Sequence, residues 1–314
     1  MSSKGQGRKV RRTQDRPVPP AAAGGYHASP YRETKRPSPP MPDTLPDKPG
    51  IPILFVHIGH KDVLDIALRQ AVLAAPDSPV ILLTDEIRDL PFPVHQTDIR
   101  LHTSSYPRFR AVYEHLSVNG EGYEAMCYGR WFFAHEFAVR HGLGRFCVFD
   151  SDIMLYRPAE HFAAPFAGRI AGNWSWANCF EGPEALGFLC DRFVGIFADK
   201  PRLHALADRF RIGGRPHVSD MHLLMEIAVG DDRFLEQGSL IDQGFDHNIR
   251  DANGRFAMRD GLKDICFGAD GIPVCARTDG GPPVPFTFLH FQGPAKERMG
   301  DFAWPIAGMA ADEG

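Results

Sequence analysis

The sequence predicts an α/β fold in which a mostly parallel, Rossmann-like sheet is flanked by helices. Its folded part opens with a short apolar run at residues 51–57, a stretch with helical apolar spacing at 62–75, and a second apolar run at 79–84. A strand, a helix and a strand in this order begin a parallel sheet. A third apolar run, at 145–149, ends abruptly at two carboxylates. The hydrophobic content of 43% is enough for a substantial core.

The composition divides the chain of 314 residues into three parts. Residues 1–50 are predicted to be a disordered, Pro-rich basic arm, because ten prolines and ten Lys or Arg residues stand there against four acids. Residues 51–304 form a single domain with halves 51–157 and 158–304, and 305–314 form a flexible tail. A basic arm is attracted to an anionic membrane surface or to nucleic acid, although a solvated tail is the simpler interpretation.

Targeting signals and cysteines favour a cytoplasmic protein. No apolar segment follows the first basic residues as in a secretory signal, and no window of about eighteen apolar residues predicts a transmembrane helix. The six cysteines contain no C-x-x-C pair, so they are interpreted as reduced core thiols rather than as a zinc site or a disulfide framework.

Asp150 and Asp152 directly follow the apolar run at 145–149. In open α/β sheets ligands bind at the carboxyl ends of the strands, and strand alternation points both acids the same way. Their oxygens suit a hard cation, Mg²⁺ or Mn²⁺, that bridges to phosphates. A solvated turn is the ordinary alternative. A helix N-cap is less consistent, because Arg157-Pro158 follows soon after.

Two other residues are predicted to lie at the same sheet edge. His57 ends the first apolar run and Asp85 follows the second, so both are grouped with the cofactor-binding residues. Asp85 can contact a base or a ribose, but a simple turn residue explains it equally well. The turn at 58–61 contains neither a G-x-G-x-x-G nor a P-loop pattern, so dinucleotide and P-loop chemistry are not supported.

Arg130 stands out in the helix predicted at 121–142. Arg130 lies on the same helix face as several apolar residues. An unpaired guanidinium on an apolar face costs free energy. Arg130 is therefore expected to bond Asp150 or Asp152, or to reach a phosphate. The alternative is a side chain that extends to solvent at the helix edge. The residues on this face are Tyr123, Cys127, Arg130, Ala134 and Phe137.

The last strong element, at 285–292, is a predicted strand that contains His290 and is followed by Gly293 and Lys296. An imidazole can complete a metal shell, a glycine lets the backbone approach a phosphate, and a lysine adds a compact positive charge. Each residue taken alone also has an ordinary structural explanation.

With these motifs the chain resembles GT-A-fold nucleotide-sugar glycosyltransferases, and is most similar to glycosyltransferase family 8. The matching motifs are Tyr128-Gly-Arg130, Asp150-Ser-Asp152 and His290-Phe-Gln-Gly-Pro-Ala-Lys296, which fits the family's H-x-x-G-x-x-K. The resemblance implies a nucleotide-binding half at 51–157 and an acceptor half at 158–304. It also implies that Mn²⁺ or Mg²⁺ is held by Asp150, Asp152 and His290, that Arg130 supports the acids, and that Gly293 and Lys296 contact the diphosphate.

The chain also departs from the family pattern. Pro-Trp does not follow Lys296, and the acceptor-side D-Q-D is replaced by Ser219-Asp-Met221. Asp220 and Asp246 are candidate catalytic carboxylates, since an inverting enzyme needs a base at the acceptor hydroxyl. The stereochemistry stays open. The aromatic residues Trp174, Trp176 and Phe180 can stack on sugars, with core packing as the default.

The resulting expectation is metal-dependent transfer from a nucleotide-sugar, with a UDP-sugar as the expected donor, to a hydroxyl of a glycan, lipid or polysaccharide. A peripheral contact of the arm with the inner face of the membrane is part of this expectation, and nucleic acid is not an expected partner. One alternative is an inactive nucleotide-sugar-binding protein of the same fold. The other is a haloacid-dehalogenase-like phosphatase, since Phe149-Asp-Ser-Asp152 and Gly230-Asp-Asp232 resemble its motifs.

Overall fold

The computed structural model describes residues 44–305. Most of the predicted arm (1–50) and almost all of the predicted tail (305–314) lie outside the described residues. Within 44–305, no helix combines the length and the apolar character needed to cross a bilayer.

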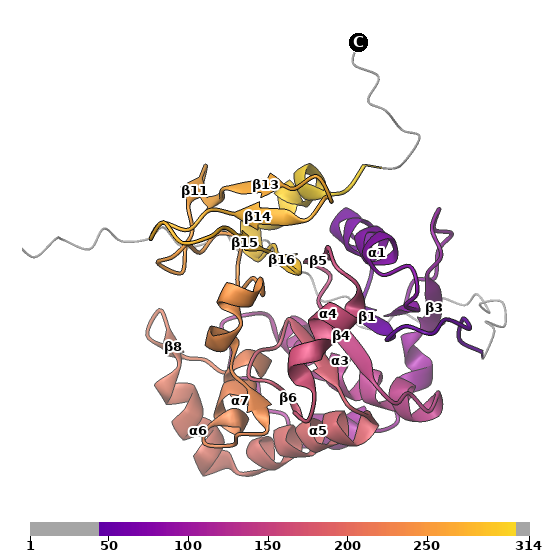
Figure 1. The fold of residues 1–314 in the computed structure, drawn as a ribbon. Coiled ribbons are helices and arrows are strands. Elements are labelled where there is room, and N and C mark those ends of the chain that lie inside the picture. Colours follow the sequence, from indigo (N-terminus) through magenta and orange to yellow (C-terminus); the bar gives the residue numbers. More distant parts are fainter. Residues whose placement is uncertain (1–43, 306–314) are drawn as a thin grey trace, which may run out of the picture.

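A five-stranded sheet forms the centre of the fold, with strand order β3-β2-β1-β4-β7 (Figure 1). The first four strands run parallel, and β7 at the edge runs antiparallel to β4. The predicted α/β class with a mostly parallel sheet is therefore confirmed. The strands are β1 (Ile53–His57), β2 (Val80–Thr84), β3 (His95–Asp98), β4 (Phe146–Phe149) and β7 (Ala177–Phe180).

Alternation along the central strands divides the core into two layers. In β1, Ile53 and Phe55 face the layer that contains α1 (Asp62–Ala74), whereas Leu54 faces the layer of α3 and α5. Helix α3 spans Glu121–Arg140 and α5 spans Pro183–Ala198, with Pro183 in the first turn. The predicted helices over 62–75 and 121–142 are thus found within two residues of their expected ends.

The prediction that the buried side chains of α3 share a single face is wrong. Tyr123 is 51% exposed, whereas Tyr128, Trp131 and Phe132, which belong to other faces, are completely buried. The helix contacts both the sheet and α5, so it is surrounded by apolar partners on most sides. Arg130 nevertheless remains an inward-facing charge, with a side chain only 12% exposed.

A two-stranded antiparallel ribbon connects the middle of the chain to its C-terminal part. β5 (Ile153–Leu155) pairs with β16 (Phe288–His290), and His290 lies opposite Ile153. The strand predicted at 285–292 is therefore split. Its first residues belong to β15 (Val284–Pro285), which pairs with β14 (Pro273–Cys275) in a separate small sheet drawn at the top of Figure 1.

The remaining elements surround this framework. Helix α7 (Asp220–Ala228) begins after Ser219, which forms a capping box with the first turn. The other helices are α2 (Tyr106–Arg110), α4 (Ala159–Ala163) and α6 (Lys200–Arg209), with 3-10 helices η1 (Ile99–His102), η2 (Ala164–Phe166), η3 (Gln237–Ser239), η4 (Ile241–Gln243) and η5 (Gly293–Phe302). The other strands are β6 (Ala171–Gly172), β8 (Arg211–Ile212), β9 (Arg215–Pro216), β10 (Phe234–Leu235), β11 (Met258–Arg259), β12 (Leu262–Lys263) and β13 (Ile265–Phe267).

His102 in η1 gives the folded protein a specific sensitivity to acid. Its side chain is buried, and burial together with the nearby positive charge of Arg140 lowers the pKa of His102 to about 4. As the pH falls below about 6.5, the unfolded chain takes up this proton first, so stability is lost between about pH 6.5 and pH 4. The contribution is about 3 kcal/mol at most.

The variant His102→Gln is expected to show a smaller loss of unfolding free energy between pH 7 and pH 4.5 than the unsubstituted protein, because glutamine does not titrate. Urea unfolding at both pH values measures the difference. His204→Gln is the matched control, since the His204 side chain is 54% exposed. An unchanged pH dependence in His102→Gln would show that protonation of His102 is not opposed by the fold.

Candidate functional site

Asp152 and His290, far apart in the sequence, meet at the carboxyl edge of the parallel sheet. Asp152 immediately precedes β5, and its carbonyl accepts a hydrogen bond of 2.9 Å from the amide of Phe291. This pairing places the Nε2 atom of His290 3.7 Å from Oδ1 of Asp152. Lys296, in η5, lies on the other side of the carboxylate with its Nζ 2.9 Å from Oδ2. The structure therefore brings an acid, an imidazole and an ammonium group together.

The His290 ring is fixed in one orientation. Its Nδ1 atom lies 2.6 Å from the carbonyl oxygen of His247, and since a carbonyl can only accept, Nδ1 carries the proton. In the neutral ring, Nε2 then has a free lone pair beside Asp152. Trp176 stacks on the imidazole with ring centroids 5.1 Å apart and planes 19° apart. His290 is thus held ready to act as a ligand or an acceptor through Nε2.

Asp246 holds the backbone of His290 in place. Its Oδ2 accepts a 3.0 Å hydrogen bond from the backbone amide of His290, and its Oδ1 is 2.8 Å from Nζ of Lys263. The side chains of Asp246 and Lys263 are both fully buried. Lys263 also donates to the carbonyls of Asn248 and Asp251. Asp246 was predicted as a candidate catalytic base, and the structure places it where both its oxygens are already bonded.

Removal of the Lys263 charge is expected to destabilise the protein strongly. In Lys263→Ala the carboxylate of Asp246 stays buried without a compensating charge, which costs about 3–5 kcal/mol. The matched control is Arg298→Ala, which breaks an exposed ion pair with Asp301 and should cost less than about 1 kcal/mol. Denaturant unfolding of the two variants provides the comparison. Equal stabilities would mean that the buried pair does not hold this part of the chain.

Arg130 connects the acid after β4 to the first residue of α7. It forms an ion pair with Asp150, and its Nη2 lies 2.7 Å from Oδ2 of Asp220 and 3.0 Å from the carbonyl of Ser175. The predicted pairing of Arg130 with an acid at the strand end is therefore confirmed. Asp220, the first residue of α7, also accepts from Nε1 of Trp131 at 3.2 Å. Arg130 thus places Asp150 and Asp220 beside each other.

Two side chains, those of Asp152 and His290, offer donor atoms that suit a divalent ion. Two ligands of one octahedral ion are about 3 Å apart when adjacent, so the 3.7 Å between Asp152 and His290 would have to shorten by less than about 1 Å for both to bind one ion. Oδ1 of Asp152 is buried and has no hydrogen-bond partner. Asp150 is directed to Arg130 instead, and among residues 44–305 no group of three His, Cys, Asp or Glu side chains is arranged for a metal. Mg²⁺ commonly needs only one or two carboxylates, because waters and substrate phosphates complete its shell.

His57, Asp85 and Gly293 lie at or near this edge with different surroundings. Burial, with a smaller effect of the Lys296 charge, lowers the pKa of His57 to about 4, and its buried Nε2 has no hydrogen-bond partner. Oδ1 of Asp85 accepts the amide of Gly59 at 2.7 Å, so this carboxylate shapes the loop after β1. Gly293 has φ +63°, a conformation that favours glycine, at the start of η5.

Sequence reasoning missed several residues that build the site. Lys61, directly before α1, lies close enough to Lys296 that its pKa is lowered, first by burial and then by the Lys296 charge. A lysine in the turn after the first strand was the available signal. The stacking of Trp176 on His290 and the support from Lys263 had no such signal, because both contacts join segments distant in sequence.

The phosphatase alternative is not favoured by the placement of its second motif. Asp231 and Asp232 follow the C-terminal end of α7, and Asp231 pairs with Arg233. The residue of this region that reaches Arg130 is Asp220, at the opposite end of a helix of nine residues, which is about 14 Å long. The two acidic motifs are therefore separated rather than joined.

No family model matches the sequence, and no curated protein matches it significantly. Among solved structures, mouse xyloside xylosyltransferase 1 in its apo form is similar with a TM-score of 0.42 and 12% identity, covering 59% of this chain and 83% of that one. The galactosyltransferase LgtC, in complex with donor and acceptor sugar analogues, has a TM-score of 0.44 and 11% identity, covering 82% and 98%. Since both TM-scores are below 0.5, a functional conclusion has to rest on the side chains at the strand ends.

Proposed function

We propose that the protein is a metal-dependent glycosyltransferase that moves a sugar from a nucleotide-sugar, with a UDP-sugar as the expected donor, to an acceptor hydroxyl. The observation that carries the proposal is the convergence of Asp152, His290 and Lys296 at the carboxyl edge of a parallel sheet. This edge is where open α/β sheets bind nucleotides. An acid and an imidazole beside a lysine suit a divalent ion and a diphosphate together.

The leaving group determines what these residues have to do. Departure of a nucleoside diphosphate concentrates negative charge on its phosphate oxygens, and Mn²⁺ or Mg²⁺ held by Asp152 and His290 would neutralise it. Lys296 is 38% exposed, so its ammonium can contact a phosphate from its position beside Asp152. Lys61 lies near enough to Lys296 to feel its charge, so two ammonium groups lie at this edge. Gly293 allows the turn that brings η5 to the same place.

On the acceptor side, Arg130 and Asp220 are the residues expected to orient the sugar. Asp220 is fixed by Arg130 and Trp131, and Asp150 is reached from the same guanidinium. We assign Asp246 a positioning role, because it acts on the site through the backbone of His290. A glycan or lipid acceptor, and a contact of the N-terminal arm with a membrane surface, remain part of the proposal.

A panel of UDP- and GDP-sugars incubated with Mn²⁺ tests the proposed function. One UDP-sugar is expected to be hydrolysed slowly without an acceptor, and chelation of the metal is expected to stop this reaction. Release of the nucleoside diphosphate is the quantity to measure. Binding without hydrolysis would favour the inactive nucleotide-sugar-binding protein, whereas a panel with neither binding nor hydrolysis would contradict the transferase assignment.

A further inference from the structure

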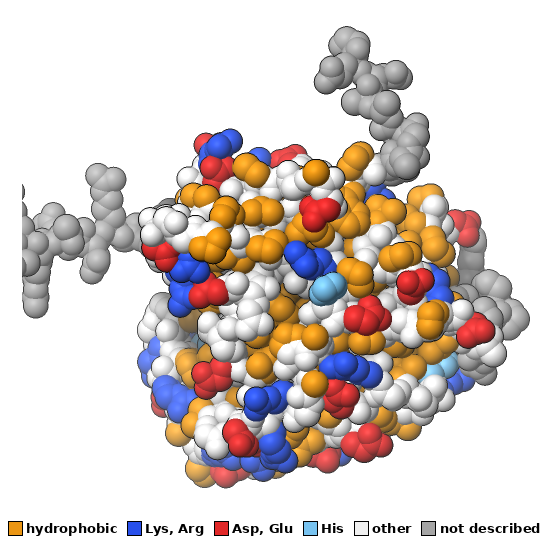
Figure 2. Space-filling model, in the orientation of Figure 1, with side chains coloured by type: hydrophobic (Ala, Val, Ile, Leu, Met, Phe, Trp, Pro, Cys, Tyr) orange, Lys and Arg blue, Asp and Glu red, His pale blue; other side chains and the backbone are white. Residues whose placement is uncertain are grey.

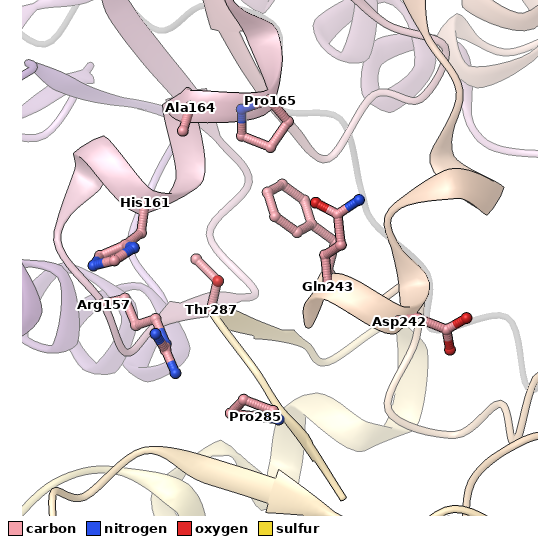
Figure 3. A pocket seen from close by; sticks show the side chains of 9 residues that line it. Arg157, His161, Ala164, Pro165, Asp242, Gln243, Pro285 and Thr287 are labelled. Carbon is pink, nitrogen blue, oxygen red and sulfur yellow. The ribbon is translucent and has the colours of Figure 1, made fainter. Parts of the chain in front are cut away.

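A recess of about 250 Å³, lined by both polar and apolar side chains, lies apart from the site described above (Figure 3). Side chains from α4, η2, η4 and the residues around β15 surround it. Its volume suits a phosphate group with a small ring rather than a drug-sized ligand. The lining residues used in the argument are Arg157, His161, Asp242, Gln243 and Thr287.

The recess lies at the far end of the β5–β16 ribbon from the proposed donor site. In this ribbon His290 pairs with Ile153 at one end, and Phe288 pairs with Leu155 at the other. Arg157 follows the Leu155 end and Thr287 precedes Phe288, so both lie beyond that end. About five residues of extended chain separate Asp152 from Arg157, which corresponds to about 16 Å. A ligand in the recess therefore does not share the donor site.

The Arg157 side chain has no counter-charge among the described residues. Its Nε atom is buried without a hydrogen-bond partner, and Arg157 forms no ion pair within residues 44–305. Arg69, Arg130 and Arg145 also have a buried Nε without a partner, but their terminal nitrogens are bonded elsewhere. A half-buried guanidinium that has no counter-charge is costly, so an external anion would stabilise it.

The one acid that lines the recess does not supply that charge. Asp242 is 2.6 Å from Arg255 and 2.8 Å from Arg277, and Figure 3 shows its carboxylate pointing away from the other labelled side chains. The imidazole of His161 lies on the same side as Arg157, with the Thr287 hydroxyl between Arg157 and the amide of Gln243. On the face of the molecule drawn in Figure 2, a Lys or Arg side chain lies beside a histidine near the middle. The recess thus offers positive charge and neutral hydrogen-bonding groups.

We propose that this recess is a second binding site that takes the phosphate or carboxylate of a ligand no larger than a monosaccharide. Arg157 binds the anionic oxygens through its planar fork, which matches both groups. Thr287 and Gln243 bind hydroxyl groups of the same ligand. The site is independent of sugar transfer, because none of its residues takes part in the donor site.

Calorimetric titrations test this proposal with four probes: inorganic phosphate, a hexose 6-phosphate, a hexuronate and the neutral hexose. The background is Lys296→Met, which weakens anion binding at the donor site. At least one anionic probe is expected to bind saturably and the neutral hexose is not. Arg157→Gln should weaken that binding at least about tenfold, and Arg157→Lys should give an intermediate loss. Which anionic probe binds separates the phosphate ligand from the carboxylate ligand.

Two further variants keep the test decisive. Arg192→Gln, on the exposed surface of α5, is the matched control and should leave binding unchanged. Thr287→Val leaves the charge in place and should weaken binding of the hexose derivatives more than binding of inorganic phosphate, which applies even if Arg157→Gln fails to fold. Absence of saturable binding by every anionic probe, or equal binding by the Arg157→Gln and Arg192→Gln variants, would overturn the proposal. Neither result depends on whether the protein transfers sugars.

Discussion

Asp152→Asn is expected to lower the metal-dependent release of nucleoside diphosphate by about 10²–10³-fold. The substitution keeps the shape of the side chain but removes the charge that faces both His290 and Lys296. Because the amide is a poor ligand for a hard cation, the ion would lose its main protein charge. The rate of nucleotide release at saturating donor and Mn²⁺ is the measurement.

A matched acid far from the site controls for general effects of charge removal. Asp208, on α6, forms an exposed ion pair with Arg211, and Asp208→Asn should retain full activity. Thermal unfolding of both variants checks that the Asp152 variant is folded. If folded Asp152→Asn kept the activity of Asp208→Asn, then Asp152 would have no part in catalysis and the proposed site would be wrong.

Arg130→Met is expected to lower both stability and activity. The substitution leaves Asp220, whose side chain is 5% exposed, without its cationic partner, and it also releases Asp150. The loss of stability is expected to be about 3 kcal/mol, because a buried charge loses its counter-charge. Activity of the folded fraction should fall by about 10²-fold, since the two acids are no longer held in place.

The double variant Arg130→Met with Asp220→Asn separates these two effects. Removal of the buried carboxylate charge should recover much of the unfolding free energy, but it should not recover activity. Urea unfolding and nucleotide release, measured on the same preparations, give both quantities. Recovery of activity together with stability would mean that Arg130 only supports the fold, and that its contacts with Asp150 and Asp220 have no role in transfer.

Local sequence patterns predicted the parts of the fold that depend on burial alone. Strands β2 and β4 are buried throughout, the first three residues of β1 are buried, and α1 has clear apolar spacing with a polar start. The pairing of Arg130 was also predictable, because a guanidinium among apolar residues needs a partner. The β5–β16 ribbon was not predictable from the sequence, because its two strands are only three residues long and lie far apart in the chain.

The sequence motifs predicted the residues of the candidate site, but not the contacts that support them. Asp152, His290 and Lys296 were expected to meet because their motifs resemble those of GT-A-fold glycosyltransferases, and spacing along the chain does not by itself bring them together. The buried pair of Asp246 and Lys263 lies in a region of short strands and loops without apolar periodicity. That Arg130 pairs with Asp150 and not with Asp152 depends on side-chain packing between separate elements, which spacing along the chain does not specify.

Titration of the protein with UDP, with and without Mn²⁺, tests most directly whether Asp152 and His290 hold an ion beside a diphosphate. The protein is expected to bind UDP at least about tenfold more tightly when Mn²⁺ is present, and Asp152→Asn is expected to lose this enhancement. Equal affinity with and without the metal in both proteins would contradict the account, because the acid and the imidazole would then not join an ion to the nucleotide.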